Sequence, residues 1–407
     1  MRRLTAPLVR GVLALGLLLA ALGCGAPERE RVTIMVPWSG TEFKAFHSVV
    51  EDFEKANPGI DVAPQVTRAL TQQLDAAVAA ETPPDLAVLP SVGAIAKYRG
   101  GALRPLGVDT SSFVDPFRLL AMDDGKVYAV PVKADVKSLV WYDRRLTPKP
   151  AGTWSALQGR PETWCLGLES PGATSGWPGA DWIADILLAE EGVETYEDWV
   201  SRGGVRWNSA PVREAWETWW GVVEGGSKGA TGRGFDEAAV ELVGDRCSLG
   251  HGALSAMAFP PDLMEDERYT YALPSPRQAL EVSADFVGKF TRDNPGADRL
   301  IAYLAGARAQ QTWVNEPGYA LSANRRVTTY DNPTQARIAG MLRSGHTLCF
   351  SAADAMDPDV SAAFYRAVME YVNGEDLTKL LKALDRVQEH LGDSPRPTPL
   401  CGAPNQA

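Results

Sequence analysis

A group of ligand-binding residue types follows the first strand-like segment of the chain. Trp38, Ser39, Gly40 and Glu42 come directly after an apolar run that has the composition of a buried strand. An indole, a hydroxyl and a carboxylate can hold a polar ligand by stacking and hydrogen bonding. Because ligands of open α/β sheets bind at the carboxyl ends of strands, we expect these side chains to line a site, together with Ser91 at the end of a later strand.

Other site chemistries have little support in the sequence. The four histidines are scattered and contain no pair at the spacing of a helical zinc site. The glycine-rich stretch 225–234 lacks the Gly-Lys-Ser/Thr order and the preceding strand of a phosphate loop, and no Gly-x-Ser-x-Gly motif occurs. We therefore expect no metal, no cofactor and no enzyme activity. A carboxylate pair for glycoside hydrolysis stays open, because two such residues need only meet in space.

The start of the chain has the features of an export signal that ends at a thiol. Three arginines precede an uncharged run at 11–22, which is shorter than the roughly 20 residues of a membrane span. Residues 21–24, Ala-Leu-Gly-Cys, resemble a bacterial lipobox. We predict a signal peptide at 1–23 and a lipid anchor on Cys24, with 24–31 as the tether. The alternative is an ordinary cleavage near Gly25, with Cys24 incidental.

Charge and cysteine content limit the partners and the compartment. The formal net charge of −11 becomes −14 when the three signal-peptide arginines are removed, so nucleic acid and anionic lipid are poor partners. Apart from Cys24 there are four cysteines, an even number in an exported chain, which predicts disulfides. These four can pair in three ways. We expect a monomer held at the outer face of the cytoplasmic membrane.

The pattern of elements predicts two α/β lobes. About 380 residues remain after the signal, more than a single core usually holds. Strand-like runs at 32–36, 60–66 and 85–89 alternate with helical periodicity, which predicts a largely parallel sheet. After Tyr128 the composition changes, and ten of the 12 tryptophans lie between Trp141 and Trp220. A second lobe is therefore expected there.

Several short stretches, in order, resemble the solute-binding proteins of ATP-driven importers, and within them the branch similar to maltose-binding and α-glucoside-binding proteins. The stretches are 53–60 (FEKANPGI), 83–90 (PPDLAVLP), 101–106 (GALRPL), 125–131 (GKVYAVP), 138–142 (SLVWY), 174–178 (TSGWP) and 284–286 (ADF), followed by Asn294-Pro295. Each is weak alone, but their order and spacing make the resemblance strong. It covers nearly the whole mature chain.

This resemblance implies a two-lobed periplasmic-binding-protein-like fold with a ligand cleft and three hinge crossings. We place the crossings near 133–135, 282–285 and 322–327. The N-terminal lobe is then 32–133 plus 284–325, and the C-terminal lobe is 134–283 plus 326–407. The cleft closes on its ligand by hinge bending. The implied partners are a sugar or oligosaccharide and the permease subunits of an ABC transporter.

Sugar recognition requires aromatic faces for the ring and charged or amide groups for its hydroxyls. The resemblance places such groups in the first lobe at Trp38, Ser39, Gly40, Glu42 and Ser91, in the second lobe at Thr174, Ser175, Trp177, Asp181, Phe259 and Phe364, and near the crossings at Asp285 and Tyr319. We expect Trp38 and Trp177 to close on the same sugar from opposite lobes. The resemblance also suggests the disulfides Cys165 with Cys247 and Cys349 with Cys401.

Some of these residues have a purely structural interpretation. Trp177 could be a core aromatic at a helix entry, and Asp181 and Glu42 could be acids favoured by a helix dipole. Phe364 fits a helical core pattern. Two other functions also stay open: a polyamine or peptide binder of the same fold, which would suit the acidic charge, and a secreted glycoside hydrolase.

Overall fold

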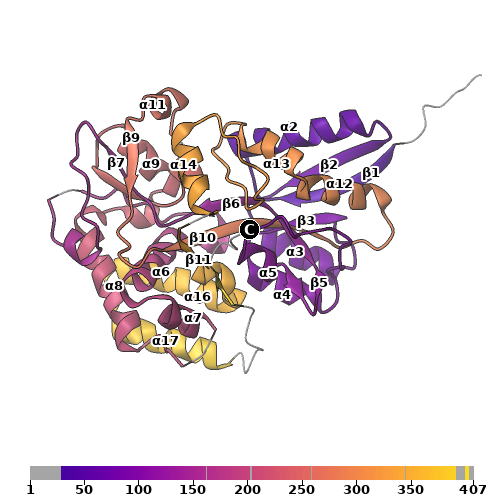
Figure 1. The fold of residues 1–407 in the computed structure, drawn as a ribbon. Helices are drawn as coiled ribbons and strands as arrows, with labels where there is room; N and C mark the ends of the chain where they lie inside the picture. The colour runs from indigo at the N-terminus through magenta and orange to yellow at the C-terminus, as the bar shows by residue number, and fades with distance from the viewer. Residues whose placement is uncertain are drawn as a thin grey trace, which may run out of the picture.

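The computed structural model describes residues 29–161, 163–201, 204–257, 259–343, 345–390 and 399–402. It shows two lobes of helices and strands on either side of a central sheet (Figure 1), as the two-lobed α/β prediction requires. The predicted signal peptide, Cys24 and all but the last residues of the tether lie outside the described residues. Among the described helices, none is both long and apolar enough to cross a membrane.

The first lobe is built on parallel strands joined by helices. β1 pairs with both β2 and β3 in parallel. Helices α2 and α13 lie on one side of these strands, with α3 and α4 on the other (Figure 1). One face of α2 is apolar, and its Phe46, Val50 and Phe53 are buried against the sheet. The elements are β1 (Glu30–Val36), α2 (Gly40–Ala56), β2 (Ile60–Val66), α3 (Leu70–Ala79), β3 (Leu86–Leu89), α4 (Val92–Arg99), α5 (Phe117–Leu120), β4 (Met122–Asp123), β5 (Lys126–Val127), α12 (Pro295–Ala305) and α13 (Ala307–Val314).

Two long strands connect the lobes. β10 (Ala279–Lys289) pairs with β11 (Thr347–Phe350) over its first residues and with β3 over its last. β6 (Ala129–Val136) runs antiparallel to β10, and the register shifts between Asp285 and Phe286. The order β12-β11-β10-β3-β1-β2, with β6 also on β10, therefore makes one sheet that is continuous between the lobes in the described part of the chain.

The second lobe combines a small antiparallel sheet with a helical layer. β7 pairs with β8 on one side and β9 on the other. In Figure 1 the helices α6, α7, α8, α16 and α17 gather below this sheet. The elements are β7 (Val140–Asp143), α6 (Trp177–Glu191), α7 (Val193–Val200), α8 (Ala210–Val223), α9 (Phe235–Val243), β8 (Leu249–His251), α10 (Leu254–Met257), α11 (Pro261–Glu265), β9 (Tyr269–Ala272), α14 (Pro333–Met341), α15 (Ala352–Ala355), α16 (Pro358–Val372), α17 (Leu377–His390) and β12 (Cys401–Gly402), with short 3₁₀ turns η2 (Ser155–Leu157), η3 (Gly172–Thr174), η4 (Glu224–Gly226) and η5 (Ala230–Gly232).

Tryptophans fill the core of this helical layer. Trp199, Trp207 and Trp216 each lie within 6 Å of the Phe364 ring centroid, at 5.8, 4.9 and 5.6 Å. Phe364 is fully buried among them. This placement differs from the sequence prediction, which put Phe364 in the ligand site. Its side chain projects from the face of α16 that packs against the other helices.

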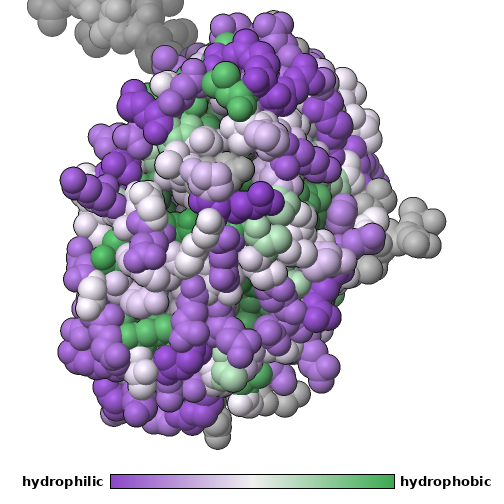
Figure 2. Space-filling view, turned by 90° about the vertical axis from the view of Figure 1, so that its left-hand side faces the viewer, coloured by the Kyte–Doolittle hydropathy of each residue, from purple (hydrophilic) through white to green (hydrophobic). Residues whose placement is uncertain are grey.

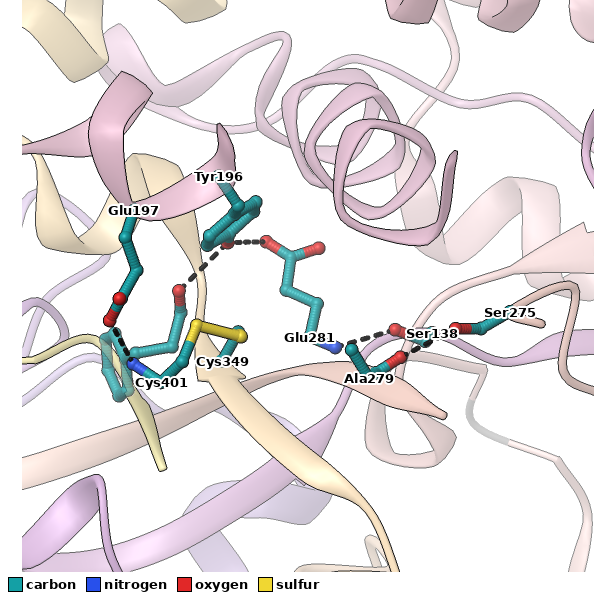
Figure 3. Close-up of a disulfide and its surroundings, with 9 residues drawn as sticks. Ser138, Tyr196, Glu197, Ser275, Ala279, Glu281, Cys349 and Cys401 are labelled. Carbon is teal, nitrogen blue, oxygen red and sulfur yellow. Dashed lines mark hydrogen bonds between the residues drawn. A yellow bond between two sulfur atoms is a disulfide. The ribbon is translucent and has the colours of Figure 1, made fainter. Parts of the chain in front are cut away.

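Both disulfides have the pairing that the resemblance suggested. Cys165 is bonded to Cys247 and Cys349 to Cys401, with Cα–Cα distances of 5.4 and 4.0 Å. The second bridge fastens the edge strand β12 to β11, and the Cys401 N–H also donates to Glu197 Oε1 at 2.9 Å (Figure 3). The short strand β12 is thus attached to the sheet covalently and by hydrogen bonds.

The face of the molecule in Figure 2 is mostly hydrophilic, with apolar residues in small separate groups. Among described residues, the large apolar side chains that are clearly exposed are Val66, Leu146 and Val240. These come from different elements. The apolar side chains exposed in this view are therefore scattered in small groups.

Candidate functional site

A cavity of about 880 Å³ lies between the two lobes. This volume is within the usual range of small-molecule sites. First-lobe loops after β1, β2 and β3 form one wall, and second-lobe loops before α6 and α9, with α15 and α16, form the other. The residues that matter below are Trp38, Ser39, Glu42, Arg68 and Ser91 from the first wall, Asp285 from β10, and Lys137, Thr174, Trp177, Asp181, Phe235, Asp354 and Tyr365 from the second.

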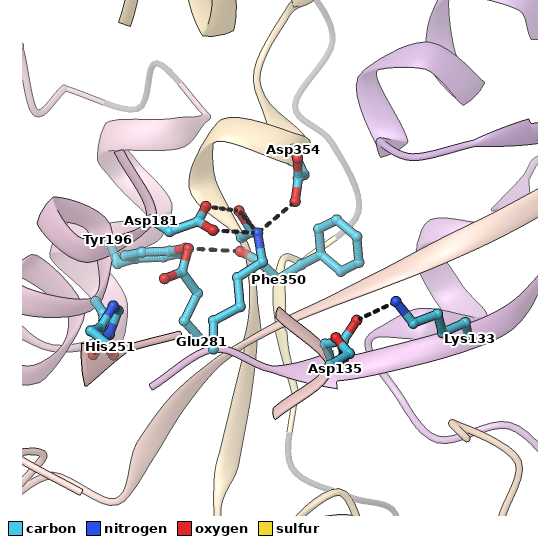
Figure 4. A network of polar contacts seen from close by, with 12 residues as sticks. Lys133, Asp135, Asp181, Tyr196, His251, Glu281, Phe350 and Asp354 are labelled. Carbon is cyan, nitrogen blue, oxygen red and sulfur yellow. Dashed lines mark hydrogen bonds and ion pairs between the residues drawn. The ribbon is translucent and has the colours of Figure 1, made fainter. Parts of the chain in front are cut away.

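A lysine between two carboxylates forms the polar centre of the second wall (Figure 4). Lys137 Nζ lies 2.9 Å from Asp181 Oδ2 and 3.0 Å from Asp354 Oδ2. Burial by itself lowers the pKa of Lys137, but the surrounding carboxylates outweigh it and raise the pKa well above its usual value. Burial raises the pKa of Asp181 to about 6 despite the lysine. Two carboxylates thus share one cation, which leaves acceptor capacity for the hydroxyls of a ligand.

A second charged group lies on β6, just before Lys137 in the sequence. Lys133 Nζ contacts Glu42 Oε1 of the first lobe at 3.0 Å and Asp135 Oδ2 at 3.4 Å. Asp135 in turn accepts a 2.6 Å hydrogen bond from Ser255 Oγ of α10. Because alternate strand residues share a face, Lys133 and Asp135 of β6 lie on the same side of that strand, and Lys137 follows just after its last residue. Through these contacts, Lys133 is paired with Glu42 of the first lobe and Asp135 is hydrogen-bonded to Ser255 of the second.

Asp285 of the other connecting strand, β10, and Trp38, which follows β1, lie next to this group. The Trp38 Nε1–H donates to Asp285 Oδ2 at 3.0 Å. Burial raises the pKa of the Asp285 carboxyl to about 6, and Lys133 acts against that rise. For Glu42, burial raises the pKa, but Lys133 and Arg68 reverse this and hold it below the usual value.

The middle of the chain, residues 37–245, matches the family model of bacterial extracellular solute-binding proteins. This match covers more than half of the 407 residues. The chain belongs to this family. Its members are binding proteins and not enzymes, so the alternative of a glycoside hydrolase is set aside. Within the described residues, no cluster of three or more His, Cys, Asp or Glu could hold a metal ion.

Full-length relatives agree with this assignment. The solute-binding protein is 28% identical to the osmoprotective compounds-binding protein GgtB of Synechocystis, over 89% of this chain and 93% of that one. It is 29% identical to the alpha-glucosides-binding periplasmic protein AglE of Rhizobium meliloti, over 85% and 84%. The solved structure of the solute receptor AcbH superposes with a TM-score of 0.76 at 16% identity, covering 89% of this chain and 99% of that one. It shares the fold.

The two tryptophans predicted to face each other occupy different environments. Trp177 is half-buried at the cleft, with its ring 5.2 Å from Phe235 and 5.8 Å from Lys137 Nζ. Trp38 is only 2% exposed and packs against Phe46 and Trp313 at 5.1 and 4.9 Å. In this structure Trp177 therefore offers an aromatic surface, whereas Trp38 mainly orients Asp285.

Several predicted residues shape the loops of the solute-binding protein at the cleft. The Ser175 hydroxyl donates to Ser170 O at 2.8 Å, and that of Thr174 to Pro171 O at 2.9 Å. Ser91 caps α4 by accepting the Ala94 N–H at 3.1 Å. The loop before α6 needs Gly176, because its φ is +103° and a Cβ there would lie 2.1 Å from Tyr365 O. Thr174 and Ser91 line the cavity, while Ser175 supports the loop from behind.

The remaining predicted residues belong to an adjoining cavity of about 660 Å³. Gly40, Phe259 and Tyr319 line it, and the Tyr319 hydroxyl donates to Phe259 O at 3.0 Å. Ser39, Glu42 and Arg68 lie between the two cavities and line both. Arg68 Nη2 donates to Ser39 Oγ at 2.7 Å. The structure thus brings most predicted residues together, but in two compartments.

Sequence reasoning missed Lys137, Asp354, Arg68 and Tyr365. The alternation of Lys133, Asp135 and Lys137 within an otherwise apolar strand was a usable signal, since buried charge in a strand usually has a partner. No local signal distinguished Asp354, which lies 217 residues along the chain from its partner Lys137. Arg68 follows β2 at the strand end, where the strand-end rule would have included it.

Replacing Asp285 by Asn should remove one pH-dependent contribution to the stability of this solute-binding protein. The carboxyl has a pKa of about 6 in the folded state, above the roughly 3.9 of an unfolded aspartate. The folded state therefore binds more protons, so this contribution is full below about pH 4 and is lost as the pH rises through 6. The expected change is up to about 1.4 kcal/mol per pH unit.

The variant keeps an oxygen that accepts the Trp38 N–H, so packing is preserved. Urea unfolding at several pH values between about 4 and 7 measures the difference in slope between wild type and Asp285→Asn. Equal pH dependence in the two proteins would contradict the assigned pKa.

Proposed function

We propose that this protein captures a sugar, an α-glucoside or another oligosaccharide, outside the cytoplasmic membrane and delivers it to the permease subunits of an ABC transporter. The observation that carries the proposal is the half-buried Trp177 ring beside the Lys137, Asp181 and Asp354 group in an interlobe cavity. The named ligands of AglE, α-glucosides, support the same class.

The chemistry of the site suits a sugar ring. An indole can cover the apolar C–H face of a pyranose, while the two carboxylates accept hydrogen bonds from its hydroxyls. Lys137 Nζ is itself engaged by Asp181, Asp354 and Ser351, so its role is to hold the two carboxylates in place. These groups project from α6, α15 and the segment after β6, so ligand binding draws on rigid elements of the second lobe.

Closure of the first lobe over this wall is the proposed capture step. We propose the lobe boundaries predicted above, with the crossings at 133–135, 282–285 and 322–327. In support, β10 changes partners between residues 282 and 286, and Ala134 pairs with Leu321 next to the third segment.

Trp177→Ala should weaken sugar binding by about 1 to 3 kcal/mol, a loss of roughly ten- to a hundredfold or slightly more, because a partly buried aromatic surface is removed. A thermal-shift screen of mono- and oligosaccharides first identifies the best ligand. Isothermal titration calorimetry with that ligand then measures the loss of affinity. The matched control is Trp220→Ala, since Trp220 is also half-buried but packs on Tyr371, outside the cleft. If the Trp177→Ala and Trp220→Ala variants bind the sugar with equal affinity, Trp177 has only a structural role.

A cationic ligand is the second candidate, and one observation favours it. Seven Asp or Glu residues line the larger cavity, against three Lys or Arg. An excess of carboxylates attracts amines as well as hydroxyls. Titration with spermidine separates the two: a polyamine that binds tightly and is not displaced by any saccharide would replace the sugar proposal.

Lipid anchoring through Cys24 is proposed from the sequence alone, since that residue lies outside the described structure. Cys24→Ser should release the protein from membranes and leave its ligand affinity unchanged, because the acyl chains tether a body whose cleft is elsewhere. Membrane fractionation in cells that lack the permease measures this. A Cys24→Ser protein that stays in the membrane fraction would contradict the anchor.

A further inference from the structure

Glu281 carries a carboxyl group that is closed off from solvent where the connecting segments enter the second lobe. It lies in β10, is 0% exposed, and its side chain is beside Tyr196 of α7 (Figure 4). Its backbone joins the two connecting segments, because Glu281 O accepts the Lys137 N–H and Ser138 Oγ accepts the Glu281 N–H, both at 2.8 Å. The capture of a ligand described above makes no use of this carboxyl.

The hydrogen bonds around this carboxyl indicate that it carries a proton. The Tyr196 hydroxyl lies 2.9 Å from Phe350 O and 3.4 Å from Glu281 Oε1 (Figure 3). A hydroxyl has one hydrogen and a carbonyl oxygen can only accept, so the shorter contact takes that hydrogen. Within the described residues, Glu281 Oε2 has no partner. An ionised Glu281 would therefore lack a well-formed hydrogen bond, whereas a neutral acid can donate its O–H to the Tyr196 oxygen.

The charges around Glu281 also oppose its ionisation. The cation that acts on it, Lys137, is already shared by two other carboxylates. Burial first, and then the neighbouring carboxylates, raise the pKa of Glu281 well above its usual value against the effect of Lys137. The titratable groups that face it are Asp181 and Asp185 of α6, Tyr196 of α7, Asp354 of α15 and Tyr365 of α16, and His251 of β8 lies 3.1 Å from Asp185.

We propose that Glu281 is a neutral carboxylic acid at neutral pH, and that loss of its proton at alkaline pH acts as a switch on the cleft by drawing Lys137 away from its partners. Ionisation releases the proton to solvent and leaves a buried anion that competes with Asp181 and Asp354 for one ammonium group. Lys137 Nζ lies 5.8 Å from the Trp177 ring centroid, so its displacement reaches the aromatic surface of the cleft. This switch goes beyond the proposed function, because it does not depend on which ligand the cleft binds.

Unfolding measured against pH tests the neutral state. A glutamate in the unfolded chain ionises near about pH 4.3, so the folded protein holds one more proton between about pH 7 and 8.5 and loses stability as the pH rises. The unfolding equilibrium constant of wild type should therefore rise about tenfold per pH unit more steeply than that of Glu281→Gln, whose amide donates to Tyr196 without titrating. Glu194→Gln, at an exposed position of α7, should keep the slope of wild type. Equal slopes in wild type and Glu281→Gln would overturn the proposal.

Infrared spectroscopy of the wild-type protein is a second test, which needs no folded variant. Asp181 and Asp285 have pKa values of about 6 and are ionised at pH 8. We expect a carboxylic-acid carbonyl band that persists at pH 8 in wild type. Where Glu281→Gln folds, its spectrum should lack this band. A wild-type spectrum without the band at pH 8 would contradict a neutral Glu281.

The fluorescence of Trp177 tests whether the proton controls the cleft. Its contribution is obtained by subtracting the emission of Trp177→Phe from that of wild type. This contribution should shift over the pH range in which the infrared band disappears, and the same difference measured in the Glu281→Gln background should stay constant. The switch would be refuted by a Trp177 emission that does not change over that range, or by a band that persists until the protein unfolds.

Discussion

Lys137→Met is expected to destabilise the folded protein by about 3 to 5 kcal/mol, because it leaves buried carboxylates without their cation. The side chains of Lys137 and Asp181 are only 11% and 8% exposed, and the lysine also pairs with Asp354. The methionine fills a similar volume, so the loss is electrostatic. Urea unfolding at neutral pH, extrapolated to zero denaturant, measures the free energy of unfolding.

The pH dependence of this variant identifies the cause. Without the cation, the folded-state pKa of Asp181 should rise further above its unfolded value, because burial already raises it to about 6. A raised carboxyl pKa favours the folded state at low pH, so the deficit of Lys137→Met should be largest near neutral pH and shrink as the pH falls toward about 4. Lys97→Met is the matched control. That lysine lines the same cavity but is 42% exposed in its pair with Asp75, so the control should lose no more than about 1 kcal/mol. Equal losses in the two variants would contradict a buried ion-pair group.

Replacing both Cys165 and Cys247 by Ala should cost about 4 kcal/mol of stability. The bridge spans a sequence separation of 82 residues. In the chain-entropy account, a loop of this size limits the unfolded ensemble by roughly that amount, although the mechanism depends on the model. Cys165 is itself buried, and the bridge ties the segment before α6 to the segment just before β8.

Thermal and urea unfolding of the double variant, under oxidising conditions, measures this loss. The Cys349→Ala/Cys401→Ala variant is a useful comparison, because its separation of 52 residues predicts a similar or slightly smaller effect. A protein without any of the four cysteines should be indifferent to reductant, whereas wild type should not. A Cys165→Ala/Cys247→Ala protein with the midpoint of wild type would contradict the prediction.

The local features of this protein could be predicted because they depend on neighbouring residues. Apolar runs and helical spacing predicted the alternating elements of the first lobe. The Asn294-Pro295 pair predicted the start of α12, where the Asn294 side chain accepts the Ala297 N–H. The order of short stretches indicated the family and, through it, the two-lobed fold and both disulfides. Strand ends also located the cleft, since the geometry of parallel sheets places those ends at one edge.

Burial was not predictable from such signals. Trp38 lies just before α2 and Trp177 is the first residue of α6, each beside small residues, yet the packing of Phe46 and Trp313 encloses only Trp38. On α16, Phe364 and Tyr365 are adjacent, but successive helical residues differ in direction by about 100°, so one lies in the tryptophan core and the other at the cleft.

Long-range charge pairing was decided by tertiary structure alone. Lys137, Asp181 and Asp354 come from three separate segments, and nothing local to any of them specifies the others. The sequence by itself predicted the alternating elements and indicated the family. Only the folded chain decided which carboxylates share a lysine and which aromatic faces the ligand, because these depend on how distant segments exclude water from one another.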